Sequence, residues 1–207
     1  MNRRIAIAGM MVLLALSLSC AKGKSSRMSQ PKETTRKASV TDYTTEGKTW
    51  FIGASIRASR MAGPTRSMIP VNMVIVNKDA GPSKISRESL VLETSDGTLL
   101  PVVSYEQFER DYRDDRSDQL AGIEWIERHT GRYPDPPFTW LELEFFPLRN
   151  TSVSPRDTID ARGRELLHGY VYFGKPSEDY EFPEGKYKLL FTPQPGPDTF
   201  VVELFPF

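Results

Sequence analysis

The amino-acid sequence predicts a mainly β protein, a β-sandwich with one helical insertion. Short stretches in which apolar and polar residues alternate recur along the chain, as in half-buried strands. Turn-forming residues separate these stretches, with 16 prolines and 14 glycines among 207 residues. Residues 104–133 follow the helical period instead. About eight short strands with turns between them are typical of a sandwich.

The first 19 residues have the three parts of a secretion signal. Arg3 and Arg4 supply the positive charge, residues 5–18 form an apolar run, and Ser17-Leu18-Ser19 gives a small-residue cleavage region. The apolar run is short for a spanning helix, which needs about 20 residues. We therefore expect a signal peptide over residues 1–19. The arginine pair alone also fits a twin-arginine signal.

The single cysteine, Cys20, follows this region directly. The sequence Ser17-Leu18-Ser19-Cys20 resembles the lipobox of bacterial lipoproteins, although that family usually has leucine where Ser17 stands. The resemblance implies lipid attachment at Cys20, a membrane as partner and a place in the cell envelope. In a host with two membranes, Ala21 in place of aspartate implies the periplasmic side of the outer membrane. The alternative is a chance cysteine after an ordinary signal peptide.

Residues 20–48 are rich in Ser, Thr, Lys and Gly and have no apolar period, which predicts a lipidated flexible tether. Residues 21–48 contain seven basic and three acidic side chains, whereas residues 49–207 contain 18 basic and 24 acidic ones. The basic segment suits an anionic bilayer, or is simply a polar linker. The acidic remainder argues against nucleic acid as a partner.

Residues 49–207 are expected to form one domain. The clearest strand is "IPVNMVIVNK", which is partly apolar on both faces, and "SLVLETSDGTLLPVV" predicts a hairpin that turns at Asp96-Gly97. Further strands are predicted at residues 49–58, 138–147, 166–174, 186–193 and 199–207. Alternation is sharp at 138–147, and turn-rich residues precede each of the last three. The helical insert at about 104–133 begins with Ser104 and Gln107, which fit a capping box.

The order of these motifs resembles the immunoglobulin-like domains of small secreted bacterial lipoproteins. The matching stretches are "VNMVIVNKDAGPSKISRESLVLETSDGTLLPVV", "ELLHGYVYFGKP" and "YKLLF". The resemblance implies an immunoglobulin-like β-sandwich in the cell envelope and carries no catalytic residue across. The helical insert departs from the family pattern.

Aromatic residues crowd into the insert, and two interpretations remain open. They seal the insert to the sheet, or part of them forms a surface for a protein partner, since Trp and Tyr are enriched at interfaces. The candidates are Tyr105, Phe108, Tyr112, Trp125 and Tyr133.

A second candidate surface lies on the predicted strand at 138–147. Trp140, Glu142 and Glu144 are two residues apart and so fall on one face. Carboxylates beside an aromatic ring are typical of sugar-binding faces. The alternative is the outward polar face of a half-buried strand.

Catalytic and metal-binding motifs are weak. His129 and His168 are the only histidines, and neither belongs to a zinc motif. The sequence contains no nucleophile elbow of the form G-x-S-x-G. The aspartates at 111–118 alternate with arginines instead of forming a calcium loop. We therefore expect no metal, no cofactor and no enzyme. The predicted function is a membrane-anchored binding or assembly module with an envelope protein as partner; the alternative is a glycan or small-ligand binder.

Overall fold

The computed structural model describes residues 36–37, 42–62, 66–78, 81–112, 138–147, 152–196 and 198–206. The signal peptide, Cys20, His129 and most of the predicted tether lie outside these residues. Within this part of the chain, no helix has the length and apolar character needed to cross a membrane.

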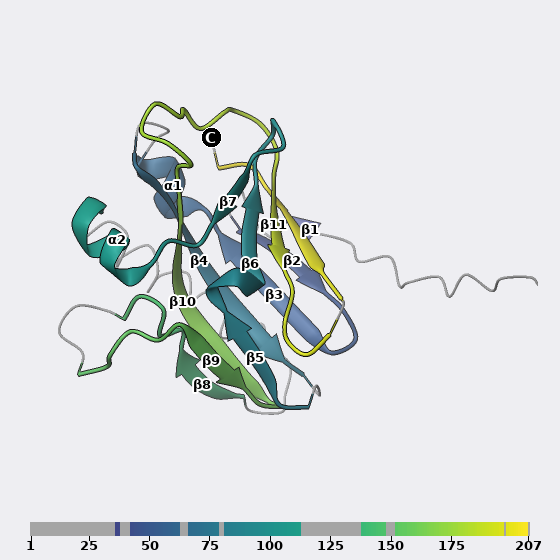
Figure 1. Cartoon of the computed structure of the whole chain (residues 1–207). Coiled ribbons are helices and arrows are strands. Elements are labelled where there is room, and N and C mark those ends of the chain that lie inside the picture. The colour runs from purple at the N-terminus through teal and green to yellow at the C-terminus, as the bar shows by residue number, and fades with distance from the viewer. Residues whose placement is uncertain are drawn as a thin grey trace, which may run out of the picture. The chain divides into compact units, whose positions relative to one another are not determined.

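The larger sheet has six strands, and its longest two lie side by side within it (Figure 1). Neighbouring strands are antiparallel except for the last pair, which is parallel. The order is β1 (Arg36–Lys37), β2 (Asp42–Glu46), β3 (Trp50–Ser55), β4 (Met68–Asn77), β10 (Glu165–Gly174) and β8 (Thr139–Glu142).

A four-stranded antiparallel sheet lies in front of the larger one in Figure 1. Its order is β12 (Phe200–Leu204), β11 (Tyr187–Phe191), β6 (Leu90–Glu93) and β7 (Leu99–Pro101). A separate ribbon pairs β5 (Ser83–Ser86) with β9 (Thr158–Ala161). The helical elements are short: α1 (Arg57–Ala62), the 3-10 turn η1 (Arg87–Ser89) and α2 (Tyr105–Asp111). The prediction of a mainly β sandwich is confirmed.

The core lies between the two large sheets. Trp50 of β3 meets Phe191 of β11 edge to face, with ring centroids 5.4 Å apart. Alternate residues of each strand point inward, because successive side chains of a strand lie on opposite faces. The four-stranded sheet contributes the fully buried side chains of Leu90, Leu92, Leu100, Tyr187, Leu189, Phe191, Val202 and Leu204.

Strand β4 is buried along its whole length. All ten of its residues are inaccessible to solvent or nearly so. Val71, Met73 and Ile75 belong to the main core, whereas Val74 and Val76 form a second apolar cluster with Leu166 of β10. The sequence of β4 carries apolar residues on both faces, and the structure buries both faces.

The predicted hairpin and the start of the insert are confirmed. Gly97 has a φ of 86°, the left-handed conformation that favours glycine in such a turn. The Ser104 hydroxyl accepts a hydrogen bond from the Gln107 N–H at 3.1 Å and caps α2. The predicted helix is thus found over Tyr105–Asp111; residues 113–137 of the insert lie outside the described residues.

The predicted tether is wrong at its C-terminal end. Residues 42–46 form β2, and its Tyr43 is 2% exposed. Asp42 is also buried, where the Ser55 hydroxyl of β3 donates a hydrogen bond to its carboxylate at 2.7 Å. The prediction relied on apolar alternation, which a polar strand such as β2 lacks. Its polar groups can be buried because hydrogen bonds stabilise them. The folded domain therefore begins before Thr49.

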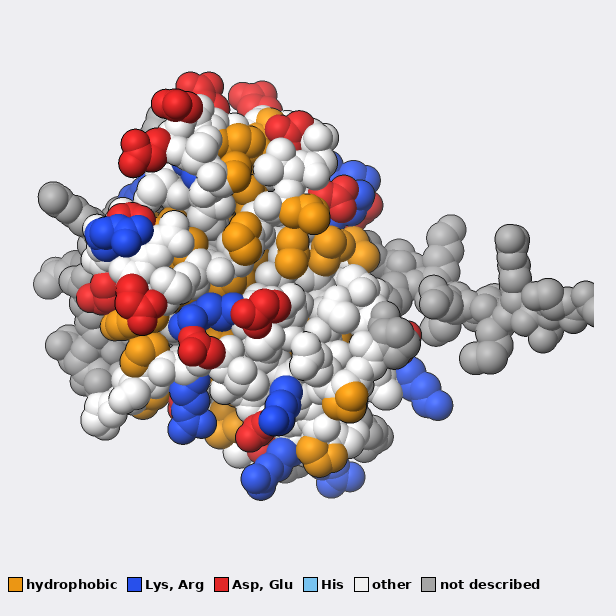
Figure 2. Space-filling view, viewed as in Figure 1, with side chains coloured by type: hydrophobic (Ala, Val, Ile, Leu, Met, Phe, Trp, Pro, Cys, Tyr) orange, Lys and Arg blue, Asp and Glu red, His pale blue; other side chains and the backbone are white. Residues whose placement is uncertain are grey.

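The outward face of the four-stranded sheet is partly apolar. Figure 2 shows apolar side chains gathered over β6, β7 and β11, with charged side chains around them. Cross-strand pairing aligns Val201, Leu190, Val91 and Pro101 in one row. In the next row the Lys188 ammonium lies 2.6 Å from the Glu93 carboxylate. The charged groups beside the apolar row thus pair within the sheet.

Candidate functional site

The aromatic residues at the start of the insert pack against the larger sheet. Phe108 lies 4.5 Å from Tyr172 between ring centroids, and Tyr112 lies 4.7 Å from Tyr172. Phe108 and Tyr112 are 6% and 3% exposed, and Tyr105 is half-buried beside them. The structure therefore corrects the prediction of a partner surface at Phe108 and Tyr112, because their side chains seal α2 to the sheet.

Two further residues of that predicted surface, Trp125 and Tyr133, lie outside the described residues. The lipid-attachment residue, Cys20, does so as well. These three positions therefore stay predictions.

The predicted ligand face is brought together in part. Trp140 and Glu142 lie on the same face of β8, and Trp140 is 40% exposed. Glu144 lies beyond the end of β8, where the chain turns, and its carboxylate is 2.7 Å from the Arg156 guanidinium. The alternating pattern of residues 138–147 thus predicted a longer strand than the structure has.

His168 joins Trp140 and Glu142 on this surface. The parallel pairing of β8 with β10 aligns Glu142 with His168, and the Trp140 and His168 rings lie 5.7 Å apart. Burial lowers the pKa of His168 from its ordinary value, and the Glu142 carboxylate partly opposes this shift. The three side chains make a small mixed surface of an indole, a carboxylate and an imidazole that favours its neutral form.

This lowered pKa gives a testable pH dependence of stability. The folded state binds the His168 proton less well than the unfolded chain, whose histidine pKa is about 6.5. The stabilisation is therefore complete above that pH and decreases as the pH falls through it. We expect His168→Gln to flatten the fall in the free energy of unfolding between pH 7.5 and 5, measured by urea denaturation. Parallel pH profiles for the two proteins would contradict this assignment.

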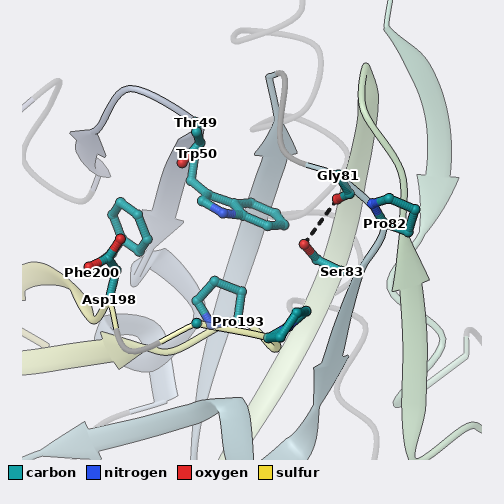
Figure 3. Close-up of a pocket in the computed structure, with 10 residues that line it drawn as sticks. Thr49, Trp50, Gly81, Pro82, Ser83, Pro193, Asp198 and Phe200 are labelled. Carbon is teal, nitrogen blue, oxygen red and sulfur yellow. Dashed lines mark hydrogen bonds between the residues drawn. The ribbon is translucent and has the colours of Figure 1, made fainter.

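A cavity opens at the end of the sandwich where β3 begins. It has a volume of about 230 Å³. Figure 3 shows the Trp50 indole between Phe200 on one side and Ser83 on the other, with Pro193 opposite. We call it the Trp50 cavity, and its lining residues are Thr49, Trp50, Gly81, Pro82, Ser83, Pro193, Pro195, Gly196, Asp198 and Phe200.

The loop that forms one wall of the Trp50 cavity is held by hydrogen bonds. The Lys84 N–H donates to the Gln194 carbonyl at 2.6 Å, and the Gln194 N–H donates to the Lys84 carbonyl at 3.0 Å. The Thr192 N–H donates to the Ser89 carbonyl at 2.8 Å, and the hydroxyls of Thr192 and Thr199 lie 2.9 Å apart. The cavity is therefore pre-formed, which lowers the entropic cost of binding.

A wider hollow of about 600 Å³ adjoins the Trp50 cavity and shares Pro82, Ser83 and Pro195 with it. Its other lining residues are Lys84, Asp160, Arg162 and Gln194. Lys84 and Arg162 are exposed, and neither side chain forms an ion pair with another described residue. We call the cavity and the hollow together the proline groove.

Sequence reasoning missed the proline groove. Its walls come from three segments far apart in the chain, at 49–50, 81–84 and 193–200, with Asp160 and Arg162 from a fourth. The available signal was the cluster of prolines and glycines at these points, which indicates turns but not that the turns meet.

No cluster of three or more His, Cys, Asp or Glu side chains suited to a metal ion occurs in the described part of the chain. Comparisons of the chain with models of known protein families, with curated proteins and with solved structures gave no match.

Proposed function

We propose that this chain is a non-enzymatic binding module of the bacterial cell envelope, held at a membrane by lipid on Cys20, and that the proline groove is its binding surface. The observation that carries the proposal is the Trp50 cavity, a concave site with apolar walls and a few polar groups. Pockets of this composition are the usual place for a ligand.

We also propose that the sandwich is of the immunoglobulin-like type. Tyr187 lies at the start of β11, and its hydroxyl donates a hydrogen bond to the Pro183 carbonyl four residues earlier, at 2.7 Å. The Tyr187 side chain is fully buried. A tyrosine that bonds back to the backbone at a strand corner is a hallmark of that fold.

Site-specific photo-cross-linking in intact cells tests the binding surface. A benzophenone amino acid at Gln194, on the rim of the proline groove, is expected to give a covalent adduct with one envelope protein. The matched control is the same amino acid at Leu99, which is 58% exposed and does not line the groove. Equal adducts from both positions, or none from either, would argue against the groove as the binding surface.

The anchor has its own test. Metabolic labelling with a radioactive fatty acid is expected to mark the wild-type chain and leave Cys20→Ala unmarked, because the thiol is the acylated group. The variant should also move from the membrane fraction to the soluble fraction, since two or more acyl chains are needed for stable attachment. A wild-type chain without label would identify the segment as a plain secretion signal.

A second candidate function is favoured by the exposed indole on β8. Trp140 is 40% exposed beside Glu142 and His168, which suits stacking on a sugar ring with polar groups at its edge. Titration with peptidoglycan fragments and cellular glycans, followed by calorimetry, tests it. Saturable heat in the wild type and none in Trp140→Ala is expected if this surface binds sugar; no heat with any glycan would remove the idea.

A further inference from the structure

We propose that the proline groove binds the C-terminal end of an extended polypeptide, with an apolar side chain in the Trp50 cavity and the terminal carboxylate at Lys84 and Arg162. This inference rests on the proposed function, because it names the ligand class of the same groove. It is argued from an indole N–H that no described residue accepts, from the apolar walls and from the distribution of charge.

The first observation is the indole N–H of Trp50. The residue is 4% exposed and lines the cavity. Its indole N–H makes no hydrogen bond to any of the described residues, and the one bond drawn in Figure 3 joins the Ser83 hydroxyl to the Gly81 carbonyl. The N–H is not among the buried side-chain atoms that lack a partner, so it keeps access to solvent and can donate to a ligand. A peptide carbonyl is a suitable acceptor, and aromatic-lined grooves bind extended peptides in this manner.

The walls of the Trp50 cavity determine which ligand side chain can lie beside the bound carbonyl. Pro193 and Phe200 are buried, and Pro82 and Pro195 close the sides of the cavity. At about 30 Å³ per water molecule, a volume of about 230 Å³ equals the space of several waters. Releasing them in favour of an aliphatic or aromatic side chain buries apolar surface, which stabilises the complex.

Charge sets the direction of the ligand. Asp198 is exposed at the Trp50 cavity and repels a carboxylate there. The adjoining hollow holds the cations of Lys84 and Arg162 and the anion of Asp160, so its formal charge is +1. A free C-terminal carboxylate therefore favours the hollow, and the preceding residues lie toward Trp50. The hollow is continuous with the cavity through Ser83, Pro82 and Pro195, so one extended chain spans both.

The test uses the full chain, purified in detergent, and fluorescein-labelled hexapeptides of alanine and proline. Each peptide carries one leucine or phenylalanine at one of its last four positions, and each is made as a free acid and as a C-terminal amide. Fluorescence anisotropy measures Kd. We expect the best free acid to bind about fivefold more tightly than its amide, because the cations are exposed and partly screened.

Three variants assign the contacts. The double variant Lys84→Ala, Arg162→Ala should remove the difference between acid and amide. Trp50→Phe should weaken binding of acid and amide alike, about three- to tenfold, through loss of the hydrogen bond. Lys188→Ala, a lysine paired with Glu93 outside the groove, is the matched control and should leave Kd unchanged.

Equal Kd values for acid and amide would overturn the carboxylate assignment, and so would an unchanged preference in the double variant. The absence of saturable binding by any peptide would overturn the inference as a whole. If the Gln194 cross-link in cells persists in that case, the groove remains the binding surface and only the ligand class is wrong. If peptides bind as expected and no cross-link forms, the proposed envelope function fails and the ligand class stands.

Discussion

A chain that begins at Thr49 is expected to lose most of its stability, whereas a chain that begins at Pro31 should retain it. The shorter chain lacks β2, and with it Tyr43, which is 2% exposed in the core. Burial of one such side chain contributes about 1.5–3 kcal/mol, out of a net stability of about 5–15 kcal/mol. Removal of β2 also leaves one edge of β3 without a partner strand, which favours aggregation.

Circular dichroism and size-exclusion chromatography measure this effect. We expect the Tm of the shorter chain to fall by about 10 °C or more relative to the chain from Pro31. Part of it should also elute as aggregate. Identical melting curves would mean that β2 contributes nothing to the fold.

Phe191→Ala is the second large effect. Phe191 is fully buried in β11, where its ring contacts Trp50 and Phe200 with centroids 5.4 and 6.2 Å apart. Truncation leaves a void between the sheets and is expected to lower the free energy of unfolding by about 3–5 kcal/mol. Urea denaturation followed by circular dichroism gives this value.

The neighbouring residue supplies the control. Leu190 lies on the outward face of the same strand and is half-buried. Leu190→Ala should therefore lower the free energy of unfolding by about 1 kcal/mol or less, because the Leu190 side chain buries little apolar surface. Equal losses for the two variants would contradict a core that lies between the two sheets.

Strands that carry apolar alternation could be predicted from the sequence. Strands β3, β11 and β12 each fall within a segment predicted to be a strand, and β4 and β10 each begin one residue before theirs. The Asp96-Gly97 turn correctly predicted the hairpin of β6 and β7. Strands β2, β5 and β9 were missed, since each has only four or five residues and a polar composition. Their stability comes from pairing with distant segments, which a local pattern does not contain.

The candidate sites also divide into features that a local sequence pattern predicts and features that depend on distant segments. The shared face of Trp140 and Glu142 follows from a spacing of two residues and was predicted. His168 joins them only through the parallel pairing of β8 with β10, which no local pattern specifies. The proline groove depends on the meeting of loops that are more than a hundred residues apart in the chain, such as those with Trp50 and Pro193.

The complete burial of β4 has a consequence for how this sequence can diverge. Most strands of a sandwich can exchange their outward residues freely, but β4 has no outward residue along Met68–Asn77. A charged side chain at any of these ten positions would lie in an apolar or densely packed environment, at a cost of several kcal/mol. In sequences that diverge from this one and keep the fold, β4 should therefore accumulate substitutions most slowly.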